Sequence, residues 1–266
     1  MCPSVSHGGR RVQERSTRLW YFGLQGLKMV QIKLKDERGF NQVFTPVGST
    51  PIRAYRRNSW FIAQAHRLNA KRILEIGCGT GEAAAQIAGG VDAEVVGIDI
   101  SDSFLTHARN TYKAPNLRFE KLDLLGEDPQ RFGKFDMIYG NGILHHLVVR
   151  LDPVLRILHS MTEPGGGLAF IEPNFLNPYC AFIFGTKIGR KWASLEPDEM
   201  AFTASGLHTT LKRAGWHDIS VATKDFLVPG IPTSFVKPIS AVEPLLEATF
   251  VTRWLAQSHF VTAQYA

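Results

Sequence analysis

From about residue 70 onward, blocks of apolar positions alternate with blocks of mixed positions along the chain. The short apolar blocks predict strands, and the mixed segments between them have the spacing of amphipathic helices. Strands that are connected by helices usually run parallel to one another. This alternation therefore predicts an α/β fold with a mostly parallel sheet. The predicted strands cover 72–77, 93–101, 116–124, 134–140 and 165–174, and the predicted helices cover 82–88, 101–113 and 153–161.

A further helix precedes this rhythm, and a looser pattern follows it. Residues 52–69 mix aromatic and aliphatic positions with arginines and predict a helix. Later, a helix is expected over 202–216, closed by Gly215, and a strand over 217–227. These additions extend the α/β pattern towards the C-terminus.

The C-terminal part divides into an irregular stretch, a helix and a strand. Three prolines within 228–240 argue against any regular element there. Apolar residues four positions apart predict a helix over 244–257, whose apolar face is either core or a membrane contact. A strand over 258–266 follows.

These elements suggest one large domain with additions at both ends. Residues 1–28 are interpreted as a flexible basic leader and 29–69 as a helical N-terminal cap. Residues 70–266 form the main domain, with an insert at 228–256 between its last two strands. Met29 would also serve as a start, in which case the leader is not translated.

Composition excludes several classes of protein. Hydrophobic residues make up 44% and charged residues 20%, as in a soluble globular chain. No apolar run approaches the roughly 18 residues of a membrane-spanning helix, which excludes a membrane channel. Cys2, Cys78 and Cys180 are too scattered for a disulfide framework or a zinc site. The N-terminus lacks the apolar core of a secretory signal, so we expect a cytoplasmic location.

The net charge of +6 is unevenly distributed. Residues 1–72 hold 14 basic and 3 acidic side chains, whereas the rest of the chain carries a net charge of −5. This asymmetry fits either a surface for anionic partners or a solvated basic face. On the predicted helix at 52–69, Arg56 and Arg57 could hold an anionic substrate or face solvent.

The most informative segment is the turn between the strand at 72–77 and the helix at 82–88. Gly77, Gly79 and Gly81 occupy alternate positions there. Glycines in such a turn allow positive φ and let backbone N–H groups approach a ligand. The dinucleotide fingerprint needs a glycine at position 82, where this chain has Glu82, so an NAD enzyme is disfavoured.

This segment, together with the strand ends that follow, resembles the class I S-adenosylmethionine-dependent methyltransferases. Residues 74–81 match that family's hydrophobic-acidic-x-Gly-x-Gly-x-Gly motif throughout. Asp99 ends the second predicted strand, and Asp123 with Leu124 ends the third. The resemblance implies a Rossmann-like doubly wound sheet, mostly parallel with an antiparallel last strand, helices on both faces and S-adenosylmethionine as cofactor.

The resemblance also implies a set of cofactor-binding residues. Asp99, followed by Ile100, would bind the ribose hydroxyls, and Asp123 and Leu124 would lie at the adenine. The remaining candidates for cofactor binding are Glu75, Gly77, Cys78, Gly79, Gly81 and Asn141. Glu75 is interpreted either as a sensor of the cofactor's cationic end or as a structural cap of the turn.

Two adjacent histidines follow the fourth predicted strand. Histidine suits general base catalysis because its ordinary pKa lies near neutral pH. In small-molecule methyltransferases with an Ile-Leu-His stretch at this place, the histidine lies beside the methyl acceptor. This implies His145 as the catalytic base, with His146 pointing towards the following helix. The alternative is that both histidines only cap or pack.

These features favour methyl transfer to a small molecule or to a lipid- or sugar-linked acceptor, with O-methylation preferred. An RNA methyltransferase or RNA-binding protein that uses the basic cap is the alternative, although nucleic acid is disfavoured as a partner. A third alternative is a binding module without catalysis. No metal site is expected. The insert at 228–256 is expected to form an apolar lid over a bulky acceptor, which allows a substrate at a membrane surface.

Overall fold

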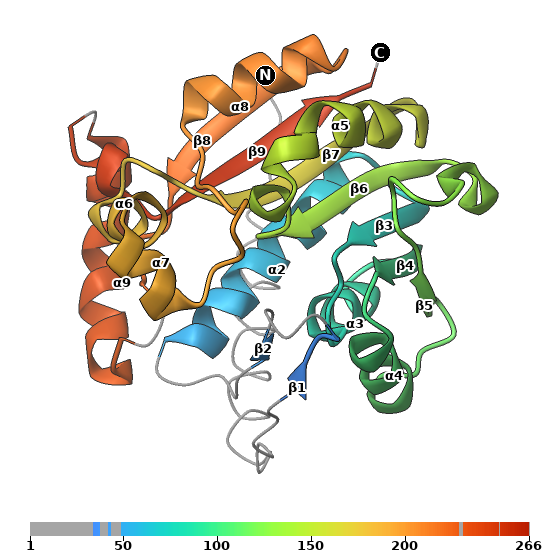
Figure 1. The fold of residues 1–266 in the computed structure, drawn as a ribbon, viewed down its shortest axis with the longest axis horizontal. Coiled ribbons are helices and arrows are strands. Elements are labelled where there is room, and N and C mark those ends of the chain that lie inside the picture. The colour runs from blue at the N-terminus through green and yellow to red at the C-terminus, as the bar shows by residue number, and fades with distance from the viewer. Residues whose placement is uncertain (1–33, 38–41, 44–48, 229–230, 250, 266) are drawn as a thin grey trace, which may run out of the picture.

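The computed structural model describes residues 34–37, 42–43, 49–228, 231–249 and 251–265. Within them, the main strands are β3 (Arg72–Ile76), β4 (Glu94–Asp99), β5 (Leu117–Lys121), β6 (Phe135–Asn141), β7 (Thr162–Pro173), β8 (His217–Lys224) and β9 (Ser258–Gln264). They form one seven-stranded sheet in the order β5-β4-β3-β6-β7-β9-β8 (Figure 1). A two-stranded pair, β1 (Leu34–Lys35) and β2 (Gln42–Val43), precedes them.

The direction of pairing confirms the predicted fold class. From β5 to β7 every neighbouring pair in the sheet is parallel. Strand β9 is antiparallel to both β7 and β8, so the last strand runs against the others. The parallel strands bring their carboxyl ends, and the loops that follow them, to one edge of the sheet.

Helices cover both faces of the sheet (Figure 1). The main helices are α2 (Thr50–Arg67), α3 (Glu82–Ala88), α4 (Asp102–Thr111), α5 (Leu151–Ser160), α6 (Pro178–Gly185), α7 (Lys187–Ala193), α8 (Ala204–Arg213) and α9 (Thr233–Ala248). Short 3-10 turns lie at Pro129–Phe132, Leu144–His146, Val148–Arg150 and Arg253–Leu255. Among the residues described above, no helix is both long and apolar enough to cross a membrane.

Two hydrophobic cores lie on opposite faces of the sheet, as the alternation along a strand requires. In β3, Leu74 and Ile76 pack in the core that contains α5 and α8. Ile73, the residue before Leu74, points to the opposite face and packs in the core that contains α2, α3 and α4. The buried sheet is therefore a rigid base from which the loops at its edge project.

The prediction for the segment before β9 was wrong. Residues 233–248 are helical even though Pro238 and Pro244 lie inside α9, and no helix covers 244–257. Contacts with the rest of the fold hold α9 in place: Glu243 accepts a hydrogen bond from the backbone N–H of Phe226 at 2.8 Å, and Glu247 accepts one from that of Asp225 at 3.0 Å. These contacts offset the backbone bonds that proline removes.

Other boundaries differ from the predictions by a few residues. Strand β5 ends at Lys121, and Asp123 lies in a turn where its side chain accepts the N–H of Leu125 at 3.0 Å. Helices α6 and α7 arise in a stretch for which the sequence predicted no element. The predicted leader, 1–28, lies outside the described residues, as does Phe250.

Candidate active site

The glycine-rich turn connects β3 to α3 at the carboxyl edge of the sheet. Gly77, Gly79 and Gly81 have φ angles of +65°, +52° and +89°, which residues other than glycine rarely adopt. A Cβ at Gly77 would lie 2.5 Å from the side chain of Ile143. A Cβ at Gly79 would meet no atom within 4 Å, so the turn is open at this point.

Asp99, at the end of β4, is bonded to the turn. Its carboxylate accepts the backbone N–H of Gly79 at 2.8 Å and that of Ser101 at 2.9 Å. Ser101 caps α4 by accepting the N–H of Phe104 at 3.2 Å. One carboxylate therefore fixes the glycine turn, the end of β4 and the start of α4 relative to one another.

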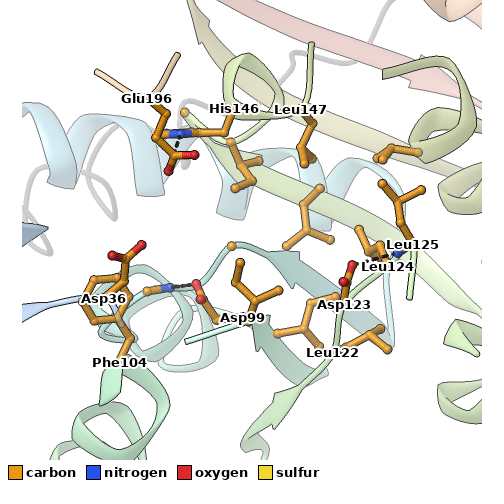
Figure 2. A pocket seen from close by; sticks show the side chains of 18 residues that line it. Asp36, Asp99, Phe104, Leu122, Asp123, Leu124, Leu125, His146, Leu147 and Glu196 are labelled. Carbon is orange, nitrogen blue, oxygen red and sulfur yellow. Dashed lines mark hydrogen bonds and ion pairs between the residues drawn. The ribbon is translucent and has the colours of Figure 1, made fainter. Parts of the chain in front are cut away.

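A cavity of about 310 Å³ lies against this turn (Figure 2). Its lining combines apolar walls with a few carboxylates and one imidazole. The lining residues are Asp36, Ile76, Gly77, Gly79, Ile98, Asp99, Ile100, Phe104, Leu122, Asp123, Leu124, Leu125, Gly142, Ile143, His146, Leu147, Val154 and Glu196. The cavity thus lies across the loops that follow β3, β4, β5 and β6.

Glu172, near the end of β7, organises the loop that follows β6. It is 1% exposed, and its carboxylate accepts the backbone N–H groups of Ile143, Leu144 and His145 at 3.0, 2.8 and 3.2 Å. The same carboxylate lies 3.0 Å from Nδ1 of His145. A buried carboxylate with these partners holds both the loop and the imidazole in one orientation.

His146 is paired with a different carboxylate. Its Nδ1 lies 3.2 Å from an oxygen of Glu199 and 3.8 Å from one of Glu196. Burial lowers the pKa of His146, but the hydrogen bond and charge of Glu199 and the charges of Glu196 and Glu172 outweigh it and raise this pKa above its ordinary value. His146 therefore keeps its proton to a higher pH than a free imidazole.

Comparison with known proteins identifies the domain that contains this site. Residues 74–168 match the family model described as a methyltransferase domain. Over these residues the chain contains a methyltransferase domain. A solved S-adenosylmethionine-dependent methyltransferase from Mesorhizobium loti superimposes on it with a TM-score of 0.56 and 22% identity, covering 79% of this chain and 99% of that one.

Relatives of this methyltransferase domain act on small molecules according to their names. The trans-aconitate 2-methyltransferase of Methylobacterium radiotolerans is 32% identical over 155 residues, which cover 57% of each chain. The 27-O-demethylrifamycin SV methyltransferase of Amycolatopsis mediterranei is 37% identical over 102 residues, or 37% of each chain. The similarity therefore spans less than two thirds of these curated relatives.

The residues around the cavity of the methyltransferase domain fit S-adenosylmethionine. The backbone at Gly79 borders open space that a side chain at this position would fill. The Asp99 carboxylate, which is hydrogen-bonded to Gly79, suits a ribose diol. Ile98, Leu122 and other apolar side chains form walls suited to an aromatic base. The cofactor, when bound, supplies a methyl group on a sulfonium, which is already activated for transfer.

Seven of the residues predicted from the sequence line the cavity of the methyltransferase domain: Gly77, Gly79, Asp99, Ile100, Asp123, Leu124 and His146. His146 was expected to point towards the following helix, and its place in the lining corrects that prediction. His145 lies behind it, with the two ring centroids 4.2 Å apart. Asn141 lies outside the lining, where its side chain accepts a hydrogen bond from Arg57 at 3.1 Å.

Glu75, Cys78 and Gly81 also lie outside the cavity lining, within the packing behind the turn. Burial raises the pKa of Glu75 to about 8, so its carboxyl carries a proton at neutral pH. Burial also raises the pKa of the Cys78 thiol well above its ordinary value. Neither group has the ionised form expected of a charge sensor or a nucleophile.

Among the described residues, His145, His146 and Glu199 form a group that could hold a metal ion. One ligand atom from each lies within 4.8 Å of the other two. Burial raises the pKa of Glu199, but His146 outweighs it and the net shift is downward. The opposite directions of these two pKa shifts fit an ion pair between His146 and Glu199.

Three arginines of α2 pair with carboxylates. Arg53 and Arg57 lie 3.4 and 2.7 Å from the same oxygen of Asp225, and Arg56 lies 2.5 Å from Glu243. Arg56 remains exposed beside Glu243, as one of the two interpretations expected, whereas Arg57 is half-buried against Asp225. These ion pairs reduce the net positive charge of the basic stretch on which the RNA alternative rested.

Sequence reasoning missed several residues of the site. Asp36 and Glu196 line the cavity, but they come from segments without any motif or periodicity. Glu172 was recognised only as part of the end of the fifth predicted strand. Its signal was a lone acidic residue in an apolar strand, which predicts a buried carboxylate that needs hydrogen-bond partners. Asn174, directly after β7, donates to the backbone oxygens of Trp254 and Ala256 at 2.9 and 2.8 Å.

Proposed function

We propose that the protein transfers a methyl group from S-adenosylmethionine to a hydroxyl group of a small-molecule acceptor, with His145 as the general base. The observation that carries this proposal is the contact between His145 Nδ1 and the buried carboxylate of Glu172 at 3.0 Å. A base held by a buried acceptor of hydrogen bonds is a recurring arrangement in enzymes that activate a hydroxyl.

The contact determines which nitrogen of His145 can act. A carboxylate only accepts hydrogen bonds, so Nδ1 of the neutral ring carries the proton. Nε2 then has a free lone pair and takes the proton of the acceptor hydroxyl. S-adenosylmethionine, when bound, would supply the methyl group to the oxygen that His145 deprotonates, and its sulfur would keep the electron pair of its bond to that methyl group.

His146 is less suited to this role. Burial lowers the pKa of His146, but the hydrogen bond and charge of Glu199 raise it overall, so this imidazole holds its proton to a higher pH than a free imidazole and is the less available proton acceptor. The different partners of the two histidines therefore favour His145 over His146 as the base.

The remaining candidate residues are proposed to bind the cofactor. Asp99 would accept from the ribose hydroxyls, with Ile100 against the sugar and base. Asp123 and Leu124 would lie at the adenine, and Asn141 at the methionine arm. Their proposed roles follow the family resemblance, and the cavity lining supports them for all but Asn141.

The relatives support a small-molecule acceptor. The name of the rifamycin methyltransferase describes transfer to an oxygen, which agrees with O-methylation. The trans-aconitate methyltransferases act on a small carboxylic acid by name. The acceptor of this protein is proposed to be of the same size class.

The His145→Ala variant tests the base. We expect binding of S-adenosylhomocysteine to stay within about a factor of two of the parent protein, and turnover with a hydroxylated acceptor to fall by about 10²–10⁴-fold. His208→Ala, an exposed histidine of α8, is the matched control and should leave both unchanged. Parent-like turnover in His145→Ala would show that His145 is not the base. Alignment of the acceptor with the cofactor would then explain the reaction.

A further inference from the structure

Exposed apolar side chains gather in two segments of the chain. Among the described residues, eleven of the thirteen large apolar side chains that are exposed lie within 176–200 or 235–255. In the first segment Ile188 is 75% exposed and Trp192 is 68% exposed. A concentration of this kind marks a contact surface more often than scattered single residues do.

The two segments are joined in space. The side chain of Asn177, which caps α6, donates to the backbone oxygen of Leu255 at 2.5 Å, and Asn174 donates to that of Trp254. Figure 1 shows α6, α7 and α9 on the same side of the molecule. We define the apolar surface by six exposed residues on α6, on α7, just before α6 and in the 3-10 turn at Arg253–Leu255: Leu176, Phe182, Ile188, Trp192, Trp254 and Leu255.

Helix α7 is fixed with its apolar side outward. A Cβ at Gly189 would overlap the backbone oxygen of Phe182, so α7 lies directly against α6 at this glycine. The guanidinium of Arg190 turns inward and donates to backbone oxygens, including that of Glu199 at 2.8 Å. Ile188 and Trp192, one turn apart, are left facing solvent.

Basic side chains lie beside the apolar ones. Lys187 and Lys191 are exposed and also one turn apart, so α7 presents an apolar stripe next to a basic stripe. Tryptophan and lysine side chains of this kind suit a lipid interface, where the ring enters the headgroup region and the ammonium meets anionic headgroups. The positive charge of Lys187 and Lys191 would add no attraction towards an uncharged protein partner.

The apolar surface adjoins the proposed base. Phe184 of α6 packs its ring edge-on to His145, with 5.7 Å between the ring centroids. The backbone N–H of Met200, in the loop after α7, donates to the backbone oxygen of His145 at 3.2 Å. Helix α6 and the loop after α7 therefore contact the proposed base directly.

We propose that the apolar surface docks on an anionic lipid bilayer, and that the acceptor is carried by that lipid phase. The proposed docking does not depend on the proposed reaction. The proposal that the acceptor is carried by the lipid phase does rest on the proposed function. The lysines supply attraction to the headgroups, and Ile188 and Trp192 supply the apolar contact.

Co-sedimentation with vesicles tests the docking. We expect the parent protein to sediment with vesicles that contain phosphatidylglycerol, to sediment less with phosphatidylcholine alone, and to be released by high salt. The double variant Ile188→Ser/Trp192→Ser should bind at least about ten-fold less, since it loses most of its apolar contact. Val149→Ser is the matched control, because Val149 is 71% exposed and does not belong to the apolar surface.

A charge-reversal double variant measures how much the lysines of α7 contribute to vesicle binding. Lys187→Glu/Lys191→Glu should abolish the preference for phosphatidylglycerol, whereas Lys113→Glu/Lys212→Glu, at exposed positions elsewhere, should keep it. A parent protein that stays in the supernatant would overturn the docking. So would a dimer in gel filtration that Ile188→Ser/Trp192→Ser dissociates, because the surface would then belong to a second copy.

Calorimetry with S-adenosylhomocysteine distinguishes this failure from failure of the proposed function. The α7 variants should bind S-adenosylhomocysteine as the parent does, because none of the changed residues lines the cavity. Loss of vesicle binding with intact cofactor binding would support the docking as a separate property. Turnover that is equal for acceptors in vesicles and in solution would overturn the lipid-borne acceptor alone.

Discussion

At the scale of single residues, Glu172 meets three backbone N–H groups and the ring of His145 while being 1% exposed. A buried carboxylate is stable only when such partners replace its lost hydration. The residue therefore links the order of the loop after β6 to the orientation of the base. We treat Glu172 as a positioning residue because it acts through His145.

The Glu172→Gln variant should affect both stability and turnover. The amide would turn an N–H₂ group towards the backbone donors, and an unsatisfied buried donor lowers the free energy of unfolding by about 1–3 kcal/mol. Turnover should fall, whereas the affinity for S-adenosylhomocysteine should hold, as measured by calorimetry. Glu163→Gln, at an exposed position of the same strand, is the control. Equal turnover in the two variants would mean that Glu172 does not position the base.

At the scale of elements, the glycine turn shows what a sequence pattern can predict. Three alternating glycines after a buried strand predicted positive φ, and all three have it. The pattern did not reveal which glycine faces the ligand. Packing separates them, because a side chain at Gly77 or Gly81 would collide with other side chains, whereas one at Gly79 would enter open space.

Two glycines with matched backbones allow a clean test of the turn. Gly79 and Gly165 have φ angles of +52° and +79°, and a Cβ at either would meet no protein atom within 4 Å. Gly79→Ala and Gly165→Ala should therefore lose a similar free energy of unfolding, about 1–2 kcal/mol, from backbone strain. Gly79→Ala alone should weaken binding of S-adenosylhomocysteine, because Gly165 lies outside the cavity lining. Equal binding by both variants would show that the turn only connects β3 to α3.

Helix α9 shows where pattern reasoning fails. Proline at three positions of 228–240 argued against a helix, yet α9 begins at Thr233 and contains Pro238. Its contacts through Glu243 and Glu247 come from residues that are distant in sequence. Local preference is a weak guide where such long-range contacts decide the outcome.

At the scale of the whole molecule, the site is assembled by the parallel arrangement of the strands. Gly77, Asp99 and Asp123 each follow a strand, and the sheet brings these strand ends to one edge. This part of the site was predictable because each residue is tied to a strand end in the sequence. Asp36 and Glu196 were not, because the fold places their segments over the cavity without any local signal.

Thermal unfolding of the parent protein with S-adenosylhomocysteine, compared with NAD, tests most directly whether the cavity binds this cofactor. At about 100 times its Kd, S-adenosylhomocysteine should raise the free energy of unfolding by about 2.7 kcal/mol, and hence raise the Tm. NAD at the same concentration should leave the Tm unchanged, because Glu82 stands where a dinucleotide site needs glycine. A Tm that S-adenosylhomocysteine leaves unchanged, or that NAD raises equally, would contradict the assignment of the cavity to S-adenosylmethionine.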